Sequence, residues 1–60
     1  MNLKKYSGKK VKVVDTDDDV HIGNVDMYVQ PNDNDGQEAI SMDCGIWLDE
    51  EDIKSIKIIS

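Results

Sequence analysis

Short runs in which apolar and polar residues alternate dominate this sequence. Because successive side chains of a β-strand point to opposite faces, each run predicts a half-buried strand. The five predicted strands are Lys10 to Asp15, Val20 to Gln30, Glu38 to Asp43, Ile46 to Leu48 and Ser55 to Ile59. Val11 and Val13 of the first strand, and Ile40 and Met42 of the third, are expected to face the core.

The alternation of the second run shifts by one residue partway along it. The apolar residues before the shift are Val20 and Ile22, and those after it are Val25, Met27 and Val29. Such a shift is how a β-bulge appears in a sequence, and we place the bulge at Gly23-Asn24. A bulge bends its strand, so this strand is expected to serve both halves of a small barrel.

Polar segments separate the predicted strands. Asn2 is expected to cap a helical turn over Leu3 to Tyr6. Asp15 to Asp19 predicts a turn, because short polar side chains bond the local backbone. Pro31 to Gln37 is a loop by composition. The acids Asp49 to Asp52 precede isoleucines spaced by three, which predicts one helical turn before the last strand.

Composition supports an all-β chain. There are six Val and seven Ile against two Leu and one Ala, and β-branched residues suit the pleated surface of a sheet. Sixty residues make one domain, 1–60. The single cysteine excludes an intrachain disulfide and favours a reducing compartment, so a cytoplasmic location is expected. No stretch is apolar enough for a secretory signal or a membrane span, and no membrane partner is expected.

The order of these elements is similar to that of small SH3-like barrels, including the Sm-like ones. The segment Gly8 to Val25 resembles the first Sm motif, with a V-x-V strand, a turn and then Gly23-Asn24-Val25. Ile53 to Ile59 resembles the end of the second Sm motif. The chain is similar overall to short Sm-like (LSM) proteins of Gram-positive bacteria and their phages. The expected fold is therefore a five-stranded, all-β SH3-like (Sm-like) barrel with a short N-terminal helical turn.

The uridine-binding residues of the Sm family have no full counterpart here. The family's Asp-x-apolar-x-Asn run corresponds to Asp26 to Gln30, which lacks the Asn, and the second motif has Asp43-Cys44-Gly45 with no Arg. The barrel therefore has more support than the RNA site. Peptide binding of the SH3 type is also disfavoured, because three scattered aromatic residues do not make a Pro-binding groove.

Charge is segregated along the chain, which carries a net −6. All thirteen acids lie within residues 13–53, and the seven Lys lie outside that range. The first and last strands pair in such barrels, so the lysines should share one side; the candidates to face phosphates are Lys9, Lys10, Lys12, Lys54 and Lys57. A basic patch for phosphates or an acidic partner and a solvated surface both fit this pattern. The acidic balance and the lack of Arg weigh against nucleic acid.

Residues suited to catalysis or metal binding are sparse. Asp15-x-Asp17-x-Asp19 resembles the start of a calcium loop, but the sixth position is Val20 rather than Gly, and we expect a hairpin turn. His21 should point outward, and His21 and Cys44 alone supply too few zinc ligands. A barrel this small fills its interior with side chains. We expect no enzyme activity, no cofactor and no metal site.

Trp47 and Tyr28 fall on the outward phase of their strands, and Tyr28 lies beside Asp26. Outward aromatic residues anchor contacts, so Trp47, Tyr28 and Asp26 are the candidate partner-binding residues; each aromatic ring could instead cap an open end of the barrel. The leading hypothesis is a non-enzymatic module that binds a protein partner or itself, as a homo-oligomer. The alternatives are an RNA-binding Sm-like protein that uses a lysine face, and a phage-type acidic inhibitor of a host protein.

Overall fold

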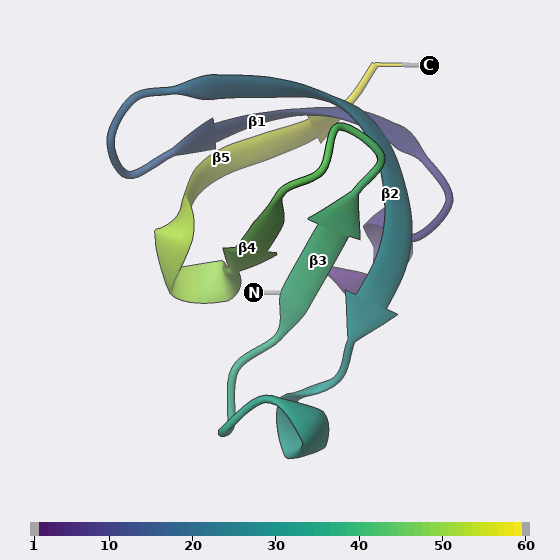
Figure 1. The fold of residues 1–60 in the computed structure, drawn as a ribbon, viewed down its shortest axis with the longest axis vertical. Helices are drawn as coiled ribbons and strands as arrows, with labels where there is room; N and C mark the ends of the chain where they lie inside the picture. Colours follow the sequence, from purple (N-terminus) through teal and green to yellow (C-terminus); the bar gives the residue numbers. More distant parts are fainter. Residues whose placement is uncertain (1, 60) are drawn as a thin grey trace.

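The computed structural model describes residues 2–59, and its five strands form one antiparallel sheet (Figure 1). The strands are β1 (Lys10–Asp15), β2 (Val20–Val29), β3 (Ala39–Met42), β4 (Trp47–Asp49) and β5 (Ile53–Ile58). The described residues also form three short 3₁₀ turns: η1 (Lys4–Tyr6) precedes β1, η2 (Pro31–Asp33) follows β2, and η3 (Glu50–Asp52) lies between β4 and β5. The all-β fold class is confirmed, with both expected helical turns.

The sheet curls around one core because β2 belongs to both of its halves. The strand order is β4-β3-β2-β1-β5, so β2 pairs with β1 on one side and β3 on the other. Figure 1 shows β2 sweeping from the upper part, where β1 and β5 lie, down to β3. The expected pairing of first and last strands is confirmed. The sheet is barrel-like but not closed, and β4 and β5 are its edges.

The bulge of β2 lies further along the strand than the sequence predicted. The register with β3 shifts between Val25 and Met27, with Asp26 as the extra residue, so the prediction of Gly23-Asn24 is wrong. Gly23 is buried opposite Val11 with no shift in that ladder. The change of phase in the sequence has another cause. The apolar residues before it, Val20 and Ile22, point away from the core.

The core is built from residues of every strand and from the segment before η1. Its buried members are Leu3, Val11, Val13, Val25, Ile40, Met42, Leu48 and Ile53. Ile46 and Ile56 pack against this cluster. The inward placement of Val11, Val13, Ile40 and Met42 is therefore confirmed, whereas Met27 is exposed. Five of these eight buried side chains are β-branched Val or Ile, the type that suits the pleated surface of a sheet.

Element ends differ from the predictions by a few residues. Leu3, not Asn2, occupies the position before η1, and no side chain caps that turn. β4 begins at Trp47 rather than Ile46. β5 starts at Ile53, immediately after η3, rather than at Ser55. Its first residue, Ile53, is buried, so the chain re-enters the core immediately after η3.

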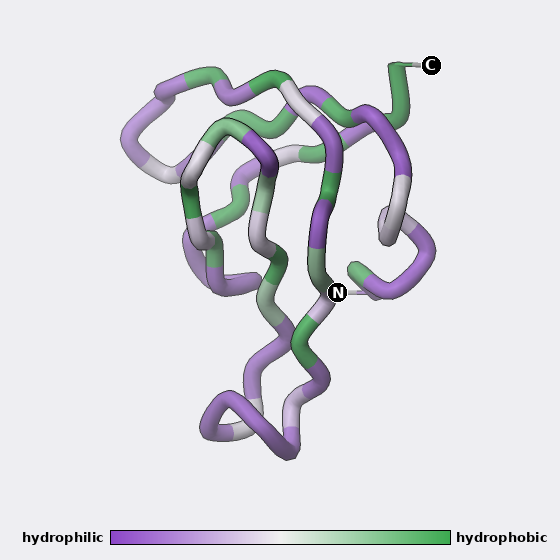
Figure 2. The backbone as a smooth tube through the Cα atoms, turned by 45° about the vertical axis from the view of Figure 1, so that its right-hand side comes forward, coloured by the Kyte–Doolittle hydropathy of each residue, from purple (hydrophilic) through white to green (hydrophobic). Residues whose placement is uncertain are grey.

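The segment between β2 and β3 extends from the body of the molecule. Figure 2 shows it at the bottom, and almost all of it is hydrophilic. η2 lies within it, and Asp35 and Gly36 take positive φ angles of 51° and 85°. Among the described residues, no helix has the length and apolar character needed to cross a membrane.

Candidate functional site

Two exposed apolar side chains lie in one row across the outer face of β2, β3 and β4. Met27 is directly opposite Ser41, and Ser41 is directly opposite Trp47. Residues directly opposite in an antiparallel pair project from the same face. Met27 is 55% exposed and Trp47 is 51% exposed. We call Met27, Ser41 and Trp47 the tryptophan row.

The indole of Trp47 is exposed and also held in place. Its Nε1 donates a hydrogen bond to Oδ1 of Asp49 at 3.0 Å, and Asn34 Nδ2 donates to the same oxygen at 2.8 Å. These bonds, that from Asn34 above all, lower the pKa of Asp49. The outward orientation predicted for Trp47 is confirmed. Because Asn34 comes from the loop after β2, the loop and β4 together fix the ring.

Tyr28 does not join this row, and its predicted outward orientation is wrong. It lies opposite Ile40 on the core side of the sheet, because the bulge at Asp26 reverses the phase of the residues after it. Its hydroxyl donates a hydrogen bond to Glu38, which raises the pKa of Tyr28 to about 12. Glu38 also accepts a bond from the backbone N–H of Leu3 at 3.0 Å. Tyr28 and Glu38 therefore fasten the N-terminal segment to the sheet.

Asp26 is exposed at the bulge, immediately before Met27. A bulge leaves its extra residue outside the ladder and re-aims its side chain. Asp26 therefore borders the tryptophan row at its Met27 end.

A second surface lies on the outer face of β2, β1 and β5. Ile22 is directly opposite Lys12, and Lys12 is directly opposite Lys57. In the next row, Val14 lies between Val20 and Ser55. Val20 and Ile22 are each 53% exposed. We call these six residues the lysine face; they are Lys12, Val14, Val20, Ile22, Ser55 and Lys57.

The sheet gathers some of the predicted lysines and separates others. Lys10 is two residues from Lys12 on β1 and extends the lysine face at one end. Lys54 is the extra residue where the β1–β5 register shifts, and it pairs with Asp18 at 2.6 Å. Lys9 is exposed just before β1. Three of the five candidates therefore share one face, and Lys9 and Lys54 lie outside it.

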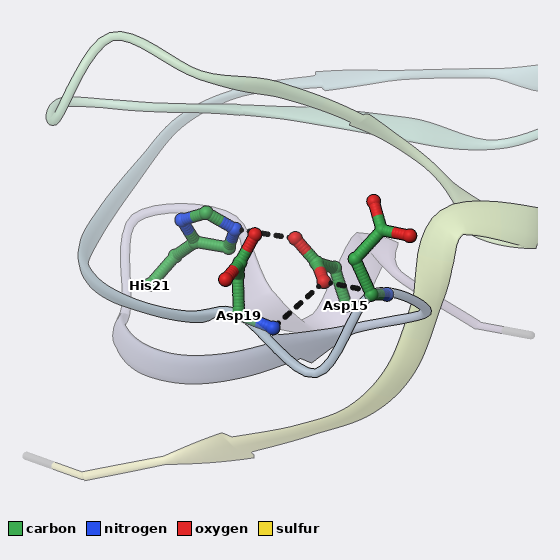
Figure 3. A network of polar contacts seen from close by, with 4 residues as sticks. Asp15, Asp19 and His21 are labelled. Atoms are coloured by element: carbon green, nitrogen blue, oxygen red, sulfur yellow. Dashed lines mark hydrogen bonds and ion pairs between the residues drawn. The ribbon is translucent and has the colours of Figure 1, made fainter.

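The turn between β1 and β2 is organised by Asp15 (Figure 3). Its Oδ1 accepts the backbone N–H groups of Asp17 and Asp19 at 2.8 and 3.0 Å, and its Oδ2 bonds His21 Nε2 at 2.8 Å. The bond from His21, first, and the backbone bonds lower the pKa of Asp15. The predicted hairpin turn is confirmed. His21 is half-buried on the core side, so its predicted outward orientation is wrong.

The groups that catalysis or metal binding would use are placed apart from one another in the fold. Asp15, Asp17 and Asp19 bring carboxylate oxygens within 4.8 Å, but the turn itself accounts for that cluster. Cys44 is exposed in the turn between β3 and β4. His21 is bonded to Asp15 in the turn between β1 and β2. No arrangement of nucleophile and base follows from these positions.

Comparisons with known proteins returned no match, whether against family models, curated proteins or solved structures. The resemblance to Sm-like proteins therefore stays a prediction from the sequence. What the structure defines is a small, open, all-β sheet with two distinct outer surfaces.

Proposed function

We propose that this chain is a non-enzymatic interaction module whose tryptophan row binds a protein partner or a second copy of the chain. The observation that carries the proposal is the exposure of Met27 and Trp47 on one face of the sheet, on either side of Ser41. Trp and Met are enriched at protein interfaces, and Trp is among the residues that contribute most to binding. The curled sheet with a shared, bent β2 also supports the proposal that the fold is Sm-like, and a cytoplasmic location remains our expectation.

The fixed indole favours binding at this row. An exposed side chain normally loses rotamer freedom when a partner covers it, and this loss weakens association. The bond from Trp47 to Asp49 has already restricted the ring. Ser41, between the two apolar side chains, offers a hydroxyl to a partner. The tryptophan row therefore presents an ordered apolar surface that a partner can contact.

The test compares Trp47→Ala with Ile58→Ala. Ile58 is also exposed, but it lies opposite Val11 on the other face of the sheet, so it controls for the loss of an exposed apolar group. Circular dichroism first establishes that both variants fold. Sedimentation velocity then measures self-association, and affinity capture from the expressing cells measures binding of other proteins.

The expected result is that Trp47→Ala loses a self-association or a captured protein that the parent and Ile58→Ala retain. Trp47 is the only tryptophan, so a blue shift of its emission on association reports its burial directly. Equal masses and equal captured proteins for all three chains would contradict the proposal. An unfolded Trp47→Ala variant would show instead that the indole supports the fold.

A further inference from the structure

We infer that the lysine face is a second binding surface, and that it takes an acidic protein segment in which carboxylates alternate with apolar side chains. This surface is separate from the tryptophan row, and the inference does not depend on the proposed function. Its two components are a pair of lysines that face each other across β1 and β5, and a strip of exposed aliphatic groups beside them.

Within the described part of the chain, no acid pairs with either lysine of this pair. Lys12 and Lys57 are directly opposite each other, and like charges in opposite positions destabilise a strand pair. Among residues 2–59, neither lysine forms an ion pair or a side-chain hydrogen bond, although the chain carries thirteen acids. Lys54, by contrast, reaches Asp18. The fold therefore keeps two ammonium groups together and available to an anion from another molecule.

The surface between the two lysines is hollowed. An open hollow of about 200 Å³ is lined by Lys12, Val14, Ser55, Ile56 and Lys57. The cross-strand pair Lys12 and Lys57 is charged, and the neighbouring pair, Val14 and Ser55, has small side chains. A carboxylate-bearing side chain fits this arrangement, with its oxygens toward the ammonium groups and its methylene groups over Val14.

The aliphatic strip determines what surrounds that carboxylate. Val20 and Ile22 are on the next strand, β2, and each is more than half exposed. Apolar side chains gain stability when a partner removes them from water. A partner that places apolar groups on Val20 and Ile22 and an acid between Lys12 and Lys57 complements both components. An alternating acidic and apolar segment has this chemistry.

Charge and composition favour a protein segment over the other occupants. The sugar-phosphate backbone of a nucleic acid offers no aliphatic side chains to cover Val20 and Ile22, and the chain has no Arg to form bidentate bonds with phosphate. A second copy docking through the same face would bring lysine against lysine. Nucleic acid and self-association are accordingly outcomes of the test that would overturn the inference.

The test uses fluorescence anisotropy with a short fluorescein-labelled peptide of alternating Glu and Leu. The parent chain should bind this peptide, and added salt should weaken binding because salt screens exposed charges. The double variant Lys12→Gln/Lys57→Gln should bind about tenfold more weakly, as charge-assisted bonds are lost. The matched control Lys4→Gln/Lys9→Gln removes the same charge from outside the face and should bind like the parent. Ile22→Ser should bind several-fold more weakly.

Reversing the charge of both lysines tests the same surface more strongly than neutralising it. Lys12→Glu/Lys57→Glu should lose the Glu-Leu peptide and gain binding of a peptide of alternating Lys and Leu. Trp47→Ala should retain the Glu-Leu peptide, which separates this surface from the tryptophan row. The inference would be overturned if the parent did not bind the Glu-Leu peptide, or if the two double-glutamine variants bound it equally. It would also be overturned if the parent preferred an oligouridine, or if Lys12→Gln/Lys57→Gln abolished self-association of the chain.

Discussion

At the scale of single residues, Glu38 joins three parts of the chain through one carboxylate. It accepts the hydroxyl of Tyr28 from β2 and the backbone N–H of Leu3 from the N-terminal segment, while Glu38 itself leads into β3. The two hydrogen bonds lower the pKa of Glu38, that from Tyr28 having the larger effect. Leu3 is fully buried, so this carboxylate holds a core residue in place.

Removing the Tyr28 hydroxyl should therefore destabilise the fold over a defined range of pH. A raised pKa means that the neutral phenol is stabilised by folding, and this contribution is complete below the ordinary value of 10 and is lost as pH rises through about 12. We expect Tyr28→Phe to lower the free energy of unfolding at neutral pH, and its difference from the parent to shrink above pH 10. Urea unfolding at a series of alkaline pH values measures this.

Tyr6→Phe is the matched control, because Tyr6 also packs against the core. Phenolate absorbance of the Tyr6→Phe chain, whose remaining tyrosine is Tyr28, reports the Tyr28 pKa directly. An ionisation at the ordinary pH of a free tyrosine would mean that the bond to Glu38 does not form in solution.

At the scale of elements, β2 shows both the reach and the limit of sequence patterns. Alternation located all five strands, because half-buried strands repeat their burial every second residue. It could not place the bulge at Asp26, because an exposed apolar residue has the same pattern as a buried one. The alternation around His21 predicts that Val20 and Ile22 face the core, but both are exposed. His21, between them, therefore lies on the core side, and the bulge at Asp26 separately turns Tyr28 toward the core.

Gly23 is the point at which β2 meets the turn between β3 and β4. A Cβ at this position would lie 2.4 Å from Asp43 Oδ1, which is far inside contact distance. Asp43 is held there because its carboxylate accepts both the backbone N–H and the Nδ2 of Asn24, at 3.0 and 2.9 Å. The glycine is therefore required by close approach.

We expect Gly23→Ala to destabilise the chain by about 1–3 kcal/mol, the usual range for overpacking. Asp43→Ala removes the carboxylate that the new methyl group would strike. The cost of Gly23→Ala should therefore be smaller in an Asp43→Ala background, and a double-mutant cycle from urea unfolding measures the difference. Additive effects of the two substitutions would show that Asp43 does not limit the space at Gly23.

At the scale of the whole molecule, the candidate surfaces depend on neighbours that are far apart in the sequence. The segregation of lysines to the two ends of the chain, with the pairing of β1 and β5, was enough to predict that some lysines would share a face. The opposition of Lys12 and Lys57 depends on strand register, which short alternating runs leave undetermined. The tryptophan row likewise needs the register of three strands. Local patterns therefore predicted the fold class better than either surface.

The acidic surface and the acids bonded within the fold should respond to pH in opposite directions. Acidification reduces the net charge of −6 and relieves repulsion. Folding nevertheless lowers the pKa values of four carboxyls through hydrogen bonds to their charged forms; they are Asp15, Glu38, Asp43 and Asp49. A lowered pKa contributes stability that is present above the ordinary value and is lost as pH falls through the folded-state value.

The bonded carboxyls should dominate in acid, because four of them lose specific bonds whereas the repulsion is spread over a screened surface. We expect the free energy of unfolding, from urea titrations, to fall as pH drops below the ordinary carboxyl values of 3.8 and 4.5. Asp15→Asn should reduce this dependence of stability on pH, since the amide that replaces the carboxylate does not titrate. Asp35→Asn removes the same charge from an exposed loop residue and should leave the acid limb unchanged. If both variants shifted that limb equally, net charge rather than the bonds of Asp15 would control acid stability.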